Sequence, residues 1–380
     1  MNWDLIIIAE TAIRALITCA LLQLAFAMMT RWERRVIAKM QWRLGPNRAG
    51  PEGLLQPFAD GLKLLFKEQL IPDRARPFLF LVAPCVSLVV SLTSFSVIPV
   101  QLGNFPFPVL TPEQGGEHAR YLFQIADLNV GVLFLLGITS LSVYGIVLGG
   151  WASGNKYSLL GGIRASAQMI SYELSLGLAL LSPLLMVGSL SFREIALFQS
   201  GTAWLFLAQP LACVVFIIAG LAETNRAPFD LPEAEQELGA GFHTEYSGMR
   251  FSIFFMAEYI AMMTVSSVLV TVFFGGPIIL PFVPHNLFPM AESFLWFALK
   301  ILICMFCFIW IRATFPRFRY DQLMSIGWRV LLPLGMLNMA ITAVGVALRF
   351  PWWGYTVAIG GTVALLYIGG KLSRRGEDQH

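Results

Sequence analysis

Nine apolar runs, each close to the length of about 20 residues that crosses a bilayer, most strongly limit how this chain can fold. Only 13% of its 380 residues are charged, whereas soluble domains have about 25%. One soluble core cannot bury so much apolar surface. We therefore predict an all-α, polytopic membrane protein whose residues 1–380 form a single transmembrane domain. The runs lie at 5–29, 78–100, 127–151, 160–188, 203–222, 251–274, 292–311, 331–348 and 354–370.

The positions of the basic residues indicate the orientation of the spans, because cytoplasmic loops carry an excess of Lys and Arg. With the N-terminus outside, the inner segments hold 21 of the 26 basic residues. Nine spans place the three basic residues of the tail inside, whereas eight would place them outside. We predict nine helices and a cytoplasmic C-terminus, although one long bent helix through Arg349 and Pro351 is an alternative. The inner segments are 31–77, 152–164, 223–250, 312–330 and the tail from 371.

The first inner segment, 31–77, contains an acid among basic residues and an amphipathic stretch. Leu54, Phe58, Leu62 and Leu65 recur at helical spacing in the stretch LLQPFADGLKLLFKE, which predicts a helix in the plane of the membrane interface. The basic residues could simply anchor the first span. Glu33 among arginines instead predicts fixed ion pairs, and arginine side chains can also hold a polar head group. The basic residues near it are Arg34, Arg35, Lys39, Arg43 and Arg48.

The second unusual inner segment, 223–250, is rich in acids, and Arg226 is the only base in its stretch LAETNRAPFDLPEAEQELGAGFHTEYS. An acidic loop is often only a solvated loop. Here, however, apolar residues such as Phe229 and Phe242 alternate with the acids, which predicts that the loop folds back into the protein. Clustered carboxylates in a partly dehydrated site raise one another's pKa values and can hold and release protons. The cluster comprises Glu223, Asp230, Glu233, Glu235, Glu237, His243 and Glu245.

Two further acids lie inside predicted spans. Glu173 and Glu258 each stand beside a tyrosine within an apolar run. A carboxylate in a membrane helix is costly, so each is a candidate proton-relay group, with a hydrogen bond between helices as the alternative.

Segment 312–330 is a positive inner loop whose arginines we expect to face the acids from the same side of the membrane. They include Arg312, Arg317 and Arg319.

Motifs for other chemistries are missing from the sequence. It contains no P-loop, no G-x-G-x-x-G and no H-E-x-x-H, and none of its four histidines stands mid-helix as a haem ligand would. Cys304 and Cys307 form a C-x-x-C spacing, but thiolates in hydrocarbon are costly. We therefore predict no metal site and no prosthetic group in this chain, and too little basic charge for nucleic-acid binding.

Four long segments resemble those of a known family, the membrane subunit 1 of respiratory complex I, or NADH:quinone oxidoreductase, in its bacterial type. They occur in the family's order and the resemblance covers about residues 10 to 350. The quoted segments are ERRVIAKMQWRLGPNRAGPEGLLQPFADGLKLLFKE, GGIRASAQMISYE, AETNRAPFDLPEAEQELGAGFHTEYSG and RATFPRFRYDQLM.

The resemblance implies a subunit, inactive alone, of an NADH-dependent respiratory-chain translocase in the bacterial inner (plasma) membrane. Partner subunits of the peripheral and membrane arms would carry FMN and iron–sulfur clusters and reduce a quinone, ubiquinone or menaquinone. It implies quinone-tunnel residues Arg34, Arg43, Asp60 and Lys63. It also implies a proton relay of Glu33, Glu173, Glu223, Glu233, Glu235, Glu237, Glu245 and Glu258, to which the acidic loop adds Asp230, with charge partners Arg226, Arg312, Arg317 and Arg319.

Two other functions stay open at this point. A ferredoxin-driven or hydrogenase-type membrane complex would use a homologous anchor subunit with parts of the same segments. A proton-coupled secondary transporter would also place acids in its spans, but it would be expected to show internal repeats and broken helices. Neither of these features is evident in the sequence.

Overall fold

The computed structural model describes residues 3–102, 122–230, 241–277, 289–351 and 354–360. In this part of the chain, seven helical segments are long and apolar enough to cross a membrane. The prediction of an all-α, polytopic membrane protein is therefore confirmed. The seven segments are Thr11–Met40, Pro77–Val97, Gly131–Ala152, Lys156–Val187, Gly248–Phe273, Ser293–Thr314 and Tyr320–Ala347.

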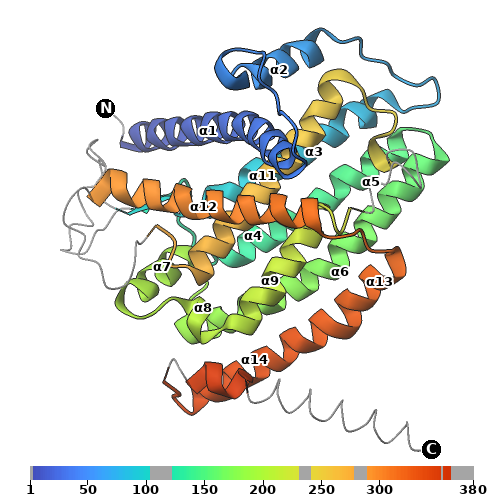
Figure 1. Cartoon of the computed structure of the whole chain (residues 1–380). Helices are drawn as coiled ribbons and strands as arrows, with labels where there is room; N and C mark the ends of the chain where they lie inside the picture. Colours follow the sequence, from blue (N-terminus) through green and yellow to red (C-terminus); the bar gives the residue numbers. More distant parts are fainter. Residues whose placement is uncertain (1–2, 103–121, 231–240, 278–288, 352–353, 361–380) are drawn as a thin grey trace, which may run out of the picture.

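Figure 1 shows the helices and the two short strands in their order along the chain. Strands β1 and β2 pair antiparallel, with Gln101 opposite Phe123. The larger helices are α1 (Trp3–Met40), α2 (Gln56–Phe66), α3 (Pro77–Ser94), α4 (Gly131–Ser140), α5 (Ser142–Ala152), α6 (Lys156–Val187), α7 (Phe192–Gly201), α9 (Pro210–Glu223), α11 (Gly248–Phe273), α12 (Pro289–Thr314) and α14 (Leu332–Ala347). The shorter elements are η1 (Pro51–Gly53), η2 (Phe95–Val97), β1 (Gln101–Leu102), β2 (Leu122–Phe123), α8 (Leu205–Ala208), η4 (Gly241–His243), α13 (Tyr320–Ser325) and the π-helix η5 (Ile326–Leu331).

The predicted span 203–222 is wrong as a single helix. It is broken at Gln209, whose backbone is not helical, into α8 and α9. Pro210 accounts for the break, because proline lacks an N–H group and fits the first turn of a new helix. The 14 residues of α9 rise only about 21 Å, less than the hydrocarbon thickness of a typical bilayer. Of the predicted span 354–370, only 354–360 lie within the described residues, and these are helical.

The spanning helices extend into two predicted inner segments, beyond the bounds that the sequence analysis gave them. Helix α1 continues to Met40, because the stretch 31–40 contains neither Gly nor Pro and is rich in good helix formers. The predicted loop 312–330 likewise becomes helical at Tyr320, and α13, η5 and α14 follow one another without a gap. The chain turns sharply after α14, at Arg349, which has a φ of +53°.

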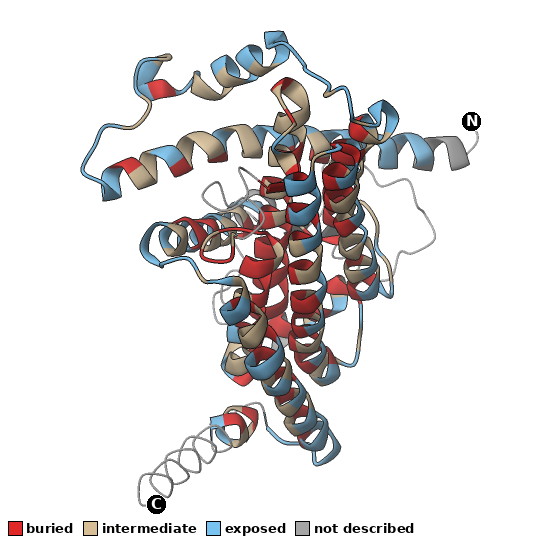
Figure 2. Ribbon diagram, turned by 90° about the vertical axis from the view of Figure 1, so that its right-hand side faces the viewer, coloured by how far each residue is buried: buried red, intermediate tan, exposed pale blue. Residues whose placement is uncertain are grey.

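Helix α6 lies at the centre of the packing. It packs against α5, α9 and α14, while α3 packs against α5 and α11. Buried residues concentrate in this central bundle (Figure 2). Helices α1 and α12 cross the direction of α6 and α14, and α2 lies beyond α1 at the end opposite α14 (Figure 1). The amphipathic helix α2 leaves its apolar side chains uncovered within this chain: Phe58 is 58% and Phe66 81% exposed.

Candidate functional site

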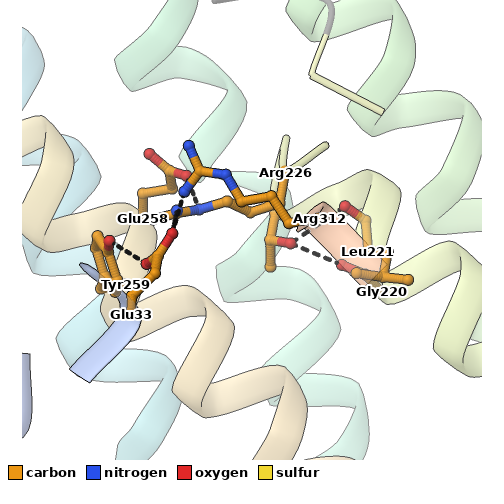
Figure 3. Close-up of polar contacts among 8 residues, drawn as sticks. Glu33, Gly220, Leu221, Arg226, Glu258, Tyr259 and Arg312 are labelled. Atoms are coloured by element: carbon orange, nitrogen blue, oxygen red, sulfur yellow. Dashed lines mark hydrogen bonds and ion pairs between the residues drawn. The ribbon is translucent and has the colours of Figure 1, made fainter. Parts of the chain in front are cut away.

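A buried cluster of charged side chains lies where α1, α11, α12 and the turn after α9 meet (Figure 3). Glu33 of α1 is 4% exposed, and one of its carboxylate oxygens, Oε1, pairs with two arginines. Arg226 Nη1 lies 3.4 Å from this oxygen, and Arg312 Nη1 of α12 also donates to it. The Tyr259 hydroxyl of α11 donates to the other oxygen, Oε2. Glu33 is thus held by three groups from three different elements.

Arg226 links Glu33 to a second acid, the half-buried Glu258. Its Nε pairs with Glu258 Oε1, and its guanidinium lies 4.1 Å from the centre of the Tyr259 ring. Burial lowers the pKa of Arg226, but the nearby Glu258, Tyr259 and Glu33 more than offset this, so the pKa stays above its ordinary value. Arg226 is therefore charged at any physiological pH, and with Arg312 it balances the two carboxylates.

Local structure places Arg226 at the tip of a tight turn. After the last residue of α9, the Thr224 N–H and hydroxyl both donate to the Gly220 carbonyl, which closes the helix. Asn225 adopts a left-handed conformation with a φ of +51°, a region that asparagine tolerates better than most residues. The Phe229 N–H then donates to the Arg226 carbonyl at 2.8 Å. The turn directs the Arg226 side chain toward α1 and α11 (Figure 3).

A cavity lies beside the cluster, between α3, α5, α6, the segment after α9, and α11. Glu223 and Glu258 both line it, and Glu173 of α6 interacts electrostatically with Glu223. Burial lowers the pKa of His243, which also lines the cavity, to about 4, so this imidazole is neutral at neutral pH. The other lining residues are mainly serines and aromatic residues: Ser87, Ser91, Ser142, Phe242, Phe251, Phe254 and Phe255.

The charged residues of α1, η1 and α2 form a second, more exposed set. Arg34 Nη1 lies 2.6 Å from Asp60 Oδ2, and Arg35 pairs with Glu52 at 2.9 Å. Hydrogen bonding from Arg35 lowers the pKa of the Glu52 carboxyl. Of the four predicted tunnel residues, the structure brings Arg34 and Asp60 together. The other two, Arg43 and Lys63, are exposed on the surface of this chain.

Other predicted site residues are more scattered. Glu245 accepts a hydrogen bond at 2.8 Å from Asn155, the residue that caps α6, rather than joining Glu33. Asp230 is half-buried at the end of the described acidic segment. Arg317 and Arg319 are exposed, and neither forms an ion pair with any residue that the structure describes. Glu233, Glu235 and Glu237 lie outside the described residues.

Sequence reasoning missed several residues that build the site. Tyr259 was singled out only as the neighbour of Glu258, although its hydroxyl bonds Glu33. Its position one residue after a carboxylate within a span was the available signal. Gln168 of α6 carried no signal of its own, yet its side chain is fully buried and bonded to the turn that bears Arg226. No property of a lone glutamine in a span predicts which backbone it contacts.

Comparison with known proteins identifies close relatives. Residues 13–343 match a family model described as NADH dehydrogenase. An H-type subunit of the NADH-quinone oxidoreductase of Geobacter sulfurreducens is 47% identical over 343 residues, covering 88% of this chain and 94% of that protein. The H-type subunit of Protochlamydia amoebophila is 52% identical over 319 residues, covering 84% and 92%. NADH-quinone oxidoreductase subunit 8 of Thermus thermophilus is 48% identical over 341 residues, covering 90% and 88%.

Proposed function

This chain belongs to the NADH dehydrogenase family, and we propose that it is the quinone-tunnel-forming membrane subunit of an NADH:quinone oxidoreductase. In this proposal it couples quinone reduction, carried out by partner iron–sulfur subunits, to proton translocation across the bacterial inner membrane. The single observation that carries the proposal is the cluster of Glu33, Arg226, Glu258 and Arg312, in which Glu33 and Arg226 are buried and the other two half-buried. Charges in the interior of a membrane protein are expensive to bury and mark functional paths.

The tunnel is proposed to run along α1 and α2. The Arg34–Asp60 pair offers hydrogen-bond donors and acceptors to a quinone head group, and the uncovered apolar side chains of α2 suit an isoprenoid tail. Arg43 and Lys63, exposed on this chain alone, would face the same tunnel once the peripheral subunits cover them. FMN and iron–sulfur clusters are assigned to those partner subunits and would deliver the electrons.

The proton relay is proposed to begin at the acids of the inner side. Reduction of a quinone to a quinol takes up two protons and two electrons, so negative charge develops wherever protons arrive after electrons. Such charge near α1 weakens the hold of Arg34 and Arg226 on their carboxylates and raises the proton affinity of nearby acids. Glu223, Asp230 and Glu245 would belong to this relay with Glu33, Glu173 and Glu258. Glu233, Glu235 and Glu237 are assigned to it from their sequence alone.

Coupling of this kind needs an element with two discrete arrangements. The cluster supplies a candidate, because Glu33 is shared between Arg226 and Arg312, and Arg226 is shared between Glu33 and Glu258. When Glu258 takes up a proton, Arg226 loses one partner and its remaining attraction to Glu33 grows. The bonds of the cluster then redistribute without any large backbone movement.

Purification of the chain with its partners tests the proposed function. The expected result is a complex that contains flavin and iron–sulfur subunits, oxidises NADH, and reduces a quinone in a reaction blocked by quinone-site inhibitors. Glu33→Gln should lower both quinone reduction and proton pumping in that assembled complex. A complex that instead accepts electrons from ferredoxin, without NADH oxidation, would point to the hydrogenase-type alternative. Normal turnover in a correctly assembled Glu33→Gln complex would contradict the relay role.

A further inference from the structure

We infer that Gln168 is a positioning residue for the proton relay: its side-chain amide fixes the turn that presents Arg226 to Glu33 and Glu258. The inference rests on the proposed function and adds a residue to it. Gln168 lies on α6, its side chain is fully buried, and it touches none of the four charged groups of the cluster through a hydrogen bond. Its effect on them would pass through the backbone of the turn.

The amide of Gln168 joins the two ends of the turn. Its Nε2 donates to the Ala222 carbonyl at 2.8 Å and to the Phe229 carbonyl at 2.7 Å. A primary amide nitrogen carries two hydrogens, and here both have acceptors. Because both partners are carbonyl oxygens, only the nitrogen of the amide can face them. One side chain therefore closes the segment 222–229, and Arg226 lies near the middle of it.

The clamp adds to two backbone bonds within the segment: the Asn225 N–H donates to the Ala222 carbonyl at 3.3 Å, and the Phe229 N–H donates to the Arg226 carbonyl at 2.8 Å. The Ala222 carbonyl lies at the end of α9, and its oxygen has two lone pairs, so it accepts from the Gln168 amide as well as from the Asn225 N–H. Asn225 holds a left-handed conformation, which is sparsely populated even though asparagine adopts it more readily than most residues. The Phe318 N–H donates to the Pro228 carbonyl at 3.2 Å, and this contact ties the segment to the chain after α12. Together with Gln168, it leaves the Arg226 backbone one well-defined position.

Position matters here because Arg226 must satisfy two carboxylates at once. A small shift of the turn would move the guanidinium away from Glu33, from which its Nη1 already lies 3.4 Å. It would then favour Glu258 alone, and Glu33 would be left to Arg312 and Tyr259. The clamp thus sets how Arg226 divides its attraction between the two acids, which is the quantity that the relay is proposed to change.

The chain contains a matched control in Gln199. Gln199 is 1% exposed, and its Nε2 donates to the backbone carbonyls of Thr271 at 2.9 Å and Val272 at 3.1 Å, with a third, longer contact to Ile195 at 3.4 Å. Its Oε1 also accepts from the Leu205 N–H at 3.2 Å. The Thr271 and Val272 carbonyls lie near the end of α11, and the thirteen residues from Glu258 to Thr271 span about 20 Å of helix axis. Gln199 thus makes the same kind of bonds far from the cluster.

The experiment compares Gln168→Met with Gln199→Met in the assembled membrane complex. Methionine keeps the length of the side chain and loses both donors. We expect both variants to lower thermal stability, and Gln168→Met alone to lower quinone reduction, by roughly tenfold or more. In an Arg226→Gln background, Gln168→Met should change turnover by less than about twofold, because its route of action is already gone. If the Gln168→Met complex does not assemble, Gln168→Asn takes its place, both alone and in the Arg226→Gln background. Asparagine keeps the N–H donors on a shorter side chain.

Two results would overturn the inference. One is an equal loss of turnover in the Gln168 and Gln199 variants, which would make Gln168 a structural residue like its control. The other is a loss from the Gln168 variant that is the same with and without Arg226. Unchanged turnover in Arg226→Gln itself would instead overturn the proposed relay, and the inference with it.

Discussion

Two polar networks inside this molecule differ in chemistry although both join several helices. The network where α1, α11 and α12 meet the turn after α9 consists of acidic and basic side chains: Glu33, Glu258, Arg226 and Arg312. The other joins α6, α14 and Gln209, at the break between α8 and α9, through neutral groups. Asn338 Nδ2 donates to Ser182 Oγ at 2.8 Å and to Gln209 Oε1 at 3.0 Å, and Gln209 donates to Thr342 at 2.9 Å.

The comparison teaches what each network is for. Neutral amides and hydroxyls join helices in an apolar medium at moderate cost, because no charge is desolvated. Buried ion pairs incur a much larger desolvation cost and seldom improve on apolar packing. This chain uses neutral hydrogen bonds to join α6 and α14 to the break before α9. It therefore has no structural need of buried ion pairs to hold its helices together. The charged cluster therefore calls for a functional explanation.

Removal of Arg226 should give the largest effect. Arg226→Gln leaves Glu33 and Glu258 without their shared partner, which we expect to cost about 3–5 kcal/mol of stability and to lower quinone reduction at least tenfold. The double variant Arg226→Gln, Glu258→Gln should recover most of the stability, because fewer charges stay unpaired, but not the turnover. Thermal denaturation and quinone reduction on membranes measure the two. Recovery of turnover along with stability would make the cluster structural.

Disruption of the neutral network should give the opposite pattern. Asn338→Leu removes two hydrogen bonds between helices and should lower the stability of the assembled complex by about 1–3 kcal/mol. Quinone reduction per assembled complex should stay within about twofold of wild type. The same two assays check this variant. A selective loss of turnover at normal stability would erase the distinction between the networks.

Exposed ion pairs provide a smaller test. Arg34–Asp60 at 2.6 Å and Arg193–Asp127 at 3.1 Å are both partly exposed surface pairs, so either Arg→Ala change should cost at most about 1 kcal/mol of stability. Only Arg34→Ala, at the proposed tunnel, should raise the KM for quinone. Steady-state kinetics over a range of quinone concentrations measures this. Equal KM values in the two variants would remove Arg34 from the tunnel.

His243 should give the smallest effect, on pH dependence alone. Its folded pKa of about 4 lies below the ordinary value of 6.5, so between these values the unfolded chain binds a proton that the folded chain does not. Stability should therefore fall as the pH is lowered from 6.5 toward 4. His243→Phe, which suits the surrounding aromatic rings, should flatten that part of the profile. Identical melting temperatures against pH in the two proteins would contradict the burial of a neutral imidazole.

The sequence predicted most of the fold because its main signal, apolar length, depends only on local composition. It failed where a single proline or a lack of helix breakers decided the outcome. Pro210 splits the predicted fifth span, and α1 runs on through the predicted loop to Met40. Both errors concern where helices begin and end, a matter of one or two backbone hydrogen bonds rather than of hydrophobicity.

For the site, the sequence could indicate which residues carry charge but not which of them meet. Glu33, Arg226, Glu258 and Arg312 were each identified as candidates, and the structure brings all four together. Arg317 and Arg319 had the same local pattern as Arg312, yet both are exposed because the chain has left α12 by then. The contact between Tyr259 and Glu33 spans 226 positions and follows only from the packing of α11 on α1.

The central claim, that the charged cluster changes its protonation during quinone reduction, is tested most directly by infrared difference spectroscopy of the assembled complex. Spectra of the oxidised and quinol-loaded states would be compared for wild type and Glu258→Gln, with Asn338→Leu as the control from the neutral network. A carboxylic C=O band that appears on quinone reduction, persists in Asn338→Leu and is lost or shifted in Glu258→Gln is the predicted result. Identical difference spectra in all three proteins would contradict it.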